Sequence, residues 1–378
     1  MPATKSRMLR GCLLGCALGT APMVHAHASE FGLALTSIYY GPYEDPADCP
    51  SGLAQTPDEV FYESLSPAER KIFKDRDKRV GSMAQYLTHI LSRRMAADGK
   101  DYCESPTSLK VPAMPTAQSK KAPYGSDLDH GDKSSTCAHD EFQDGAGQAV
   151  IDNQLYRLMA CVGGVRKENN RHNQNTDALL RSGSGVTLLR VTGVDNMQND
   201  DDVTVGIYKS ADRFIKDGSG EPLPDATMRA DKGAPTFQSM TKGKIVNGTL
   251  ITTPVDARLV QNPGDYFIKG ASFQISLNEK GYGEGILTGY HDTGSFWDSW
   301  KKQGGQQREL GFTCPALYEA LNRLADGYKD SSGKCTAISS AFKVKAVRTF
   351  VVPVDKPGDI SELETPTPSS PTQLAFSR

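Results

Sequence analysis

The densest group of potential metal ligands in the sequence lies between residues 127 and 144. It holds five aspartates, one glutamate and two histidines. Carboxylates this close together repel one another unless a cation or solvent separates them. Oxygen-rich loops suit Ca²⁺, which takes about six to eight oxygen ligands. We therefore predict a calcium site in this loop, with the ligands Asp127, Asp129, Asp132 and Asp140.

Two other interpretations of this loop stay open. Counted from Asp127, the glycine of an EF-hand loop would fall one position after Gly131, and Ala138 stands where the final glutamate belongs. A solvated acidic loop without a metal fits the same residues. A zinc site through His130 and His139 is the third interpretation, although this spacing puts them on no common helix or strand face.

A second group with binding chemistry surrounds the only two tryptophans of the chain. They are three positions apart, so one helical turn would bring them side by side. Flat aromatic rings beside carboxylates can cover the C–H faces of a sugar while the acids accept hydrogen bonds from its hydroxyls. We predict a ligand-binding cluster of Tyr290, His291, Asp292, Trp297 and Trp300. The alternative is that the two tryptophans pack this segment onto the core.

Familiar catalytic motifs are missing from the sequence. It contains neither Gly-x-Ser-x-Gly nor His-Glu-x-x-His, the patterns of many serine hydrolases and zinc proteases. The glycines at 281–285 fit a hairpin better than a phosphate loop, because no long helix follows them. A carboxylate pair for glycoside cleavage stays compatible with the 45 acidic residues. The sequence therefore does not decide whether the protein is an enzyme.

The first 28 residues have the three parts of a secretory signal. Three basic residues precede an apolar stretch at 11–24, and Ala26-His27-Ala28 provides a small-x-small cleavage site. The stretch is shorter than the roughly 20 apolar residues that cross a bilayer, and no later segment qualifies as a transmembrane segment. We expect cleavage after Ala28 and a periplasmic or secreted product, with lipidation at Cys16 as the alternative.

Six cysteines follow this signal: Cys49, Cys103, Cys137, Cys161, Cys314 and Cys335. An even number of thiols in an oxidising compartment favours three disulfides, each adding about 2–4 kcal/mol of stability. The sequence does not fix the pairing. Because the entropy lost on loop closure is smallest for near neighbours, we favour Cys49–Cys103, Cys137–Cys161 and Cys314–Cys335. No Cys-x-x-Cys pair exists, which argues against a thiolate metal site and excludes a c-type haem.

The charge balance limits the choice of partners. The chain carries 43 basic and 45 acidic residues, and the signal holds three of the bases and no acid, so the mature part has 40 against 45 and a net charge of −5. This mild acidity argues against nucleic acid as the main partner. We expect no haem or nucleotide cofactor.

Local signals predict helices in the first part of the chain and strands in the second. Capping boxes with proline at the first helical position begin helices at Thr56 and Ser66, and further helices are expected at 82–98, 151–161 and from Thr313. Alternating apolar residues predict strands near 203–207, 271–278, 284–290 and 342–352. Val246-Asn247-Gly248-Thr249 is the strongest hairpin signal. The acidic run Asp195 to Asp202 joins two strands as a turn or a ligand loop.

These elements predict an α+β protein, in which an N-terminal helical, disulfide-containing region precedes an antiparallel β-sandwich with one C-terminal helix. The expected division is a signal at 1–28, a helical or irregular region at 29–165 with a Pro-rich linker at 104–125, the sandwich at 166–353 and a disordered tail at 354–378.

We expect an exported, non-catalytic module that binds a glycan or another polymer, with calcium ordering its loops. This expectation rests on the signal, the cysteines, the acidic loop and the tryptophan pair. A secreted hydrolase that uses a metal or a carboxylate pair is the first alternative. A component of a surface or periplasmic assembly is the second, because the Pro-rich segments also suit a protein partner.

Overall fold

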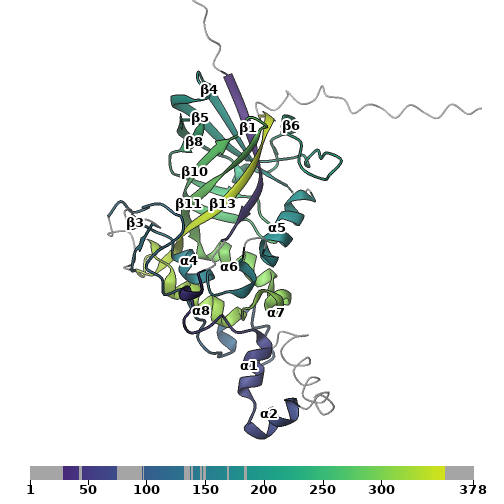
Figure 1. Cartoon of the computed structure of the whole chain (residues 1–378), viewed down its shortest axis with the longest axis vertical. Coiled ribbons are helices and arrows are strands. Elements are labelled where there is room, and N and C mark those ends of the chain that lie inside the picture. The colour runs from purple at the N-terminus through teal and green to yellow at the C-terminus, as the bar shows by residue number, and fades with distance from the viewer. Residues whose placement is uncertain are drawn as a thin grey trace, which may run out of the picture.

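The computed structural model describes residues 29–41, 45–74, 96, 98–131, 137, 139–144, 147, 150–167, 170–182 and 185–353. The predicted signal, the C-terminal tail, most of the helix expected at 82–98 and Asp132 lie outside the described residues. Within the described part, strands form a barrel and a group of helices covers one of its ends (Figure 1).

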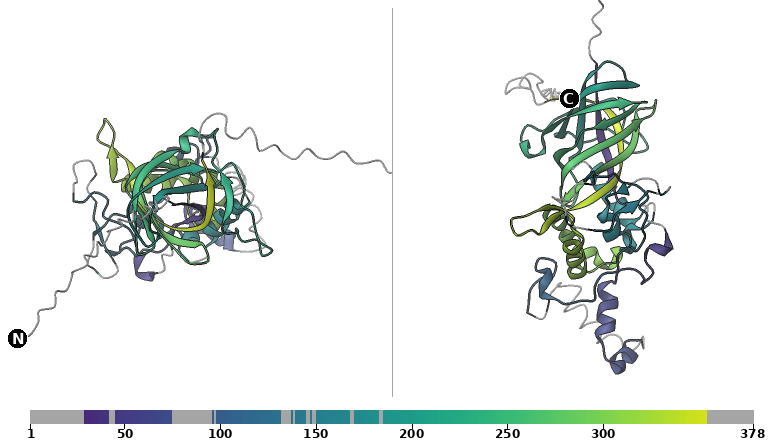
Figure 2. Two further views of the ribbon diagram at one scale, coloured as in Figure 1. Left: turned by 90° about the horizontal axis from the view of Figure 1, so that it is seen from above. Right: turned by 90° about the vertical axis from the view of Figure 1, so that its left-hand side faces the viewer.

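Eight antiparallel strands close into the barrel. Their order around it is β1 (Ser29–Tyr39), β4 (Thr187–Val194), β5 (Asn199–Lys209), β7 (Ser239–Val246), β8 (Thr249–Thr252), β10 (Tyr266–Leu277), β11 (Tyr282–Asp292) and β13 (Cys335–Val352). β13 also pairs with β1, from Gly32 opposite Thr349 to Tyr39 opposite Lys343, and this ladder shuts the ring. The view from above in Figure 2 looks down the ring.

The inner wall of the barrel is made by apolar side chains that alternate with other residues along each strand, as in β5. Val203, Val205 and Ile207 of β5 are all fully buried, and intervening side chains point outward. Asn247 and Gly248 have φ angles of 50° and 75°, as a two-residue turn between twisted strands requires. The predicted β7–β8 hairpin is therefore confirmed.

Short strands extend the barrel sheet at its margins. β6 (Ala226–Arg229) pairs in parallel with β13, β9 (Val255–Leu259) pairs with β10, and β12 (Gly327–Lys329) pairs with the start of β13. A separate ribbon is formed by β2 (Phe142–Gln143) and β3 (Val150–Ile151). The loop that contains this ribbon lies beside the helical end of the barrel (Figure 1).

The helices gather mainly below the barrel in Figure 1. They are α1 (Pro57–Ser64), α2 (Pro67–Lys74), α4 (Gln154–Met159), α5 (Arg171–Arg181), α6 (Thr293–Lys302), α7 (Gln307–Leu310) and α8 (Cys314–Leu324). The predicted capping box of Thr56 and Glu59 begins α1 and is confirmed. One continuous apolar core runs from Phe273 inside the barrel to Trp300 of α6 and Leu317 of α8. The helices thus form a cap that shares the interior of the barrel.

The predicted β-sandwich and the N-terminal helical region are wrong, because the chain forms a closed barrel whose first strand is β1. Residues 31–38 of β1 are buried on both faces, one toward the barrel and the other toward outer apolar residues such as Phe214. A strand buried on both faces has no polar alternation. Residues 29–39 therefore lack the alternating pattern that indicates a strand.

The six cysteines that follow the predicted signal all form disulfides, as predicted, but the predicted local pairing is wrong. The bonds are Cys49–Cys161, Cys103–Cys314 and Cys137–Cys335, with separations of 112, 211 and 198 residues. Three such bonds are typical of proteins that mature in an oxidising compartment. None of the helices in the described part of the chain has the length and apolar character that a membrane crossing needs.

Candidate functional site

Part of the predicted metal loop does converge on one point. Carboxylate oxygens of Asp127, Asp129 and Asp152 all lie within 4.8 Å of one another. Asp152 follows β3 and holds the loop in place, because its Oδ2 accepts hydrogen bonds from the backbone N–H groups of Leu128 (2.7 Å) and Asp129 (3.3 Å). The loop is thus folded around a buried carboxylate.

A small cavity lies directly beside this cluster. Its volume is about 20 Å³, and four carboxylic acids line it: Asp129, Glu141, Asp152 and Asp326. The rest of the wall is His139, Gln154, Tyr290 and Cys137, which is bonded to Cys335. A space of about 10–15 Å³ holds one water molecule, so this cavity has room for a single water or ion.

The electrostatics of the cavity favour a cation. Asp152 and Asp326 are only 8% and 7% exposed. Burial raises the pKa of Asp326 to about 7, and the charge on Asp152 adds to the rise. Burial also raises the pKa of Asp152, with contributions from the charges of Asp129 and Asp127. A divalent cation at this point would offset the repulsion between the carboxylates, which adds to the effect of burial on both pKa values.

The four predicted metal ligands do not all reach this point. Asp127 and Asp129 belong to the cluster, whereas Asp140 is an exposed residue whose backbone oxygen accepts hydrogen bonds from Gln154 and Arg157. Asp132 lies outside the described residues. Sequence reasoning did not assign Asp152 and Asp326 to this site, because both lie outside the 127–144 loop and reach it only through the fold.

The second predicted cluster lies mostly within the core. Trp300 and His291 are fully buried, and Tyr290 and Trp297 are 8% exposed. Trp300 stacks against His172 at 5.1 Å, and Trp297 meets the edge of Tyr318 at 4.9 Å. The tryptophans thus attach α6 to α5 and to α8, as the packing alternative expects.

Asp292 has a structural task at the start of α6. Its Oδ1 accepts a hydrogen bond from the backbone N–H of Ser295, and its carboxylate forms an ion pair with Lys269 at 3.5 Å. This arrangement is an ordinary N-cap. A ligand-binding role of these five residues stays a prediction.

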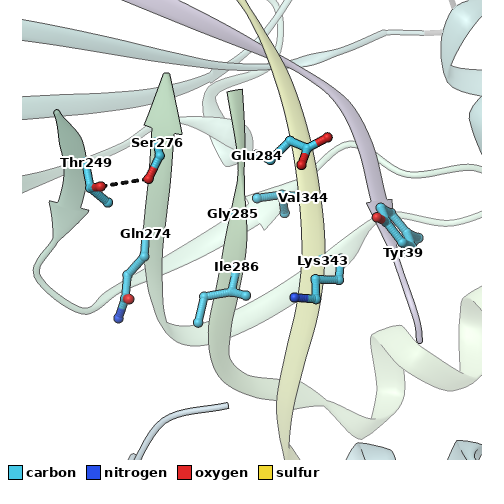
Figure 3. A pocket seen from close by; sticks show the side chains of 9 residues that line it. All are labelled: Tyr39, Thr249, Gln274, Ser276, Glu284, Gly285, Ile286, Lys343 and Val344. Atoms are coloured by element: carbon cyan, nitrogen blue, oxygen red, sulfur yellow. Dashed lines mark hydrogen bonds between the residues drawn. The ribbon is translucent and has the colours of Figure 1, made fainter. Parts of the chain in front are cut away.

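A larger groove of about 520 Å³ crosses the outer wall of the barrel (Figure 3). It spans β8, β10, β11, β13 and β1, and its lining residues are Tyr39, Thr249, Gln274, Ser276, Glu284, Gly285, Ile286, Lys343 and Val344. They offer a phenol ring, an amide, two hydroxyls, a carboxylate and an ammonium group. The groove therefore presents both hydrogen-bond donors and acceptors on a rigid sheet.

The strand register arranges these side chains in two rows. Gln274, Ile286, Lys343 and Tyr39 are consecutive partners across β10, β11, β13 and β1. Thr249, Ser276 and Glu284 form the second row, in which the hydroxyls of Thr249 and Ser276 lie 2.7 Å apart. Directly opposed side chains on one sheet face are about 4.5–5.5 Å apart at Cβ.

This groove could not be found from sequence patterns. Its residues come from five strands, and no local sequence pattern connects them. Only the register and the closure between β1 and β13 place Tyr39 beside Lys343.

Comparison with protein-family models, with curated proteins and with solved structures finds no match to this chain.

Proposed function

We propose that the protein is an exported, non-catalytic binding module that holds a glycan in the groove on the outer wall of the barrel. The observation that carries this proposal is the row of Gln274, Ile286, Lys343 and Tyr39 across four strands, with Glu284 and two hydroxyls beside it. The predicted signal and the three disulfides support export.

A glycan matches the chemistry of this wall better than a charged or apolar ligand does. Amide, hydroxyl and carboxylate groups hydrogen-bond to sugar hydroxyls, while the Tyr39 ring and the Ile286 side chain can cover C–H faces. One carboxylate and one ammonium group line the groove, so it has no excess charge to select an ion.

We also propose that Ca²⁺ binds at Asp127, Asp129 and Asp152 and orders the loop that they belong to. The donors are hard carboxylate oxygens, which Ca²⁺ prefers over softer ligands, and the neighbouring cavity has the volume of a single ion. In this proposal the metal has a structural role, because the glycan groove involves none of these residues.

The groove is tested by replacing Tyr39, the only aromatic side chain among the described residues that line it. We expect the wild-type chain to bind a subset of glycans on a broad array and Tyr39→Ala to lose about tenfold or more in affinity, as truncation of a central aromatic contact usually does. Tyr282→Ala is the matched control, because Tyr282 is exposed on β11 but does not line the groove. Binding would be measured by titration calorimetry with the best glycan of the array. The absence of any glycan ligand, or equal affinity of Tyr39→Ala and the wild type, would contradict the proposal.

One observation favours a hydrolase as the second candidate. Asp326, with a pKa of about 7, shares a cavity with Asp152, and a protonated acid beside a carboxylate is the arrangement of many glycosidases. We place this candidate second because a cavity of about 20 Å³ admits an ion or a water but no sugar ring.

A further inference from the structure

We infer that the end of the barrel opposite the helical cap holds a second, separate binding site, for a single aromatic ring that carries an uncharged polar substituent. The site is a cavity of about 160 Å³ at the mouth of the barrel. The helices cover the other end, and the turn of β4 and β5 lies at this one (Figures 1 and 2).

The wall of this cavity is apolar and lies inside the ring of strands. It is made by inward-facing side chains of β1, β7, β8 and β10: Phe31, Ile245, Leu250, Ile275 and Leu277. The first four are at most 9% exposed, and Leu277 is half-buried. The volume is close to the roughly 150 Å³ of an apolar protein cavity that takes up benzene. One ring fits this space, whereas a sugar would leave its hydroxyls unpaired.

The mouth of the cavity is formed by the β4–β5 and β7–β8 hairpins, which hydrogen bonds hold together. The backbone N–H of Gly248 donates a hydrogen bond to the Gln198 carbonyl at 2.9 Å, and the N–H of Asn247 donates to Asn199 Oδ1 at 3.0 Å. Asp200 Oδ2 closes the β4–β5 turn by accepting hydrogen bonds from the N–H groups of Asp195 and Asn196. The acidic run in the sequence thus shapes the rim of this cavity.

The polar groups at the rim of the cavity determine which polar substituent the ligand can carry. Gln198 and Asn278 contribute amides at the edge, and Glu279 and Arg348 contribute charges. Arg348 is already engaged by Asp225 through two hydrogen bonds of 2.6 and 2.8 Å, so its charge is compensated. A carboxylate on the ligand would meet Glu279 without an uncommitted cation. An alcohol or amide suits the two rim amides better.

The inference is tested with 2-phenylethanol and the full chain. We expect saturable binding to the wild type by calorimetry or ligand-observed NMR, and weaker binding of phenylacetate. Leu277→Trp fills the cavity from its wall and should lower the affinity at least tenfold. Met197→Trp should act in the same way from the rim, and the 42% exposure of Met197 makes that substitution safe for folding.

Met240→Trp is the matched control, because Met240 is 57% exposed on β7 and does not line the cavity. It should bind 2-phenylethanol as the wild type does. Tyr39→Ala should also bind it normally, because Tyr39 lines the glycan groove and not this cavity. No saturable binding to the wild type, or full affinity in both cavity-filling variants, would overturn the inference.

Discussion

Two histidines lie inside the core, and burial keeps both rings neutral. Burial lowers the pKa of His172 to about 4, although its hydrogen bond with Gln303 opposes the shift. Burial alone lowers the pKa of His291 to about 3. Neither ring nitrogen of His291 has a hydrogen-bond partner among the described residues, and Tyr266, Phe296 and Phe342 surround the ring. His291 is therefore a buried polar group in an aromatic setting.

We expect His291→Phe to stabilise the protein against acid. An unfolded histidine binds a proton below a pH of about 6.5, whereas folded His291 binds one only near pH 3. Stability therefore falls as the pH drops from about 6.5 toward the folded pKa, by up to about 3 kcal/mol at pH 4. The phenylalanine variant removes this loss and needs no hydrogen bond.

Chemical denaturation of the wild type and His291→Phe at pH 4, 5.5 and 7 measures the effect. His130→Phe is the control, because it makes the same replacement at an exposed position outside the core. If His291→Phe loses stability with falling pH as steeply as the wild type does, the burial argument for His291 is wrong.

At the scale of the element, the loop before β3 depends on charges that the fold brings together. Asp152 anchors the loop through two backbone hydrogen bonds, and Asp127 and Asp129 lie within 4.8 Å of it. A loop shaped around mutually repelling carboxylates gains stability from a bound cation.

We expect Ca²⁺ in excess to raise the melting temperature of the EDTA-treated protein by about 3 °C or more. Asp152→Asn should abolish the rise, because it removes the central carboxylate. Asp201→Asn, an exposed acid of β5, should keep it. Calorimetric scans with and without Ca²⁺ check this. An unchanged melting temperature in the wild type would leave the cluster as a solvated acidic loop.

The elements that the sequence predicts well are those with local causes. Asn247-Gly248 fixes a turn through its own backbone angles, and Thr56 and Glu59 begin α1 through contacts within four residues. No local sequence pattern indicates β1, because the segments that bury both of its faces are distant in the chain. The sequence places Asp127 and Asp129 of the carboxylate cluster in one loop, whereas Asp152, which follows β3, joins them only in the fold.

At the scale of the molecule, the disulfides join segments that the predicted pairing kept apart. Cys103–Cys314 links the segment between α2 and α4 to the start of α8, and Cys137–Cys335 links the acidic loop to the start of β13. The entropy of loop closure favours near neighbours only in a chain without tertiary structure. Here the packing of the cap on the barrel decides which thiols meet.

We expect the double variant Cys103→Ser with Cys314→Ser to lose about 3–5 kcal/mol of unfolding free energy, because that bond closes 211 residues of chain. Denaturant titration measures the loss, and non-reducing peptide mapping tests the pairing. The single variants would show whether a free thiol adds effects of its own. Recovery of Cys49–Cys103 or Cys314–Cys335 in the peptide map would contradict this architecture.

The ladder between β1 and β13 also has a consequence for biosynthesis. β13 is the last barrel strand in the chain, and it pairs with the first barrel strand on one side and with β11 on the other. A nascent polypeptide that lacks β13 therefore has two unpaired edge strands, β1 and β11, and each can pair with a strand of another molecule. Productive folding must wait for the final strand, so a chaperone that shields β1 and β11 during emergence would raise the yield.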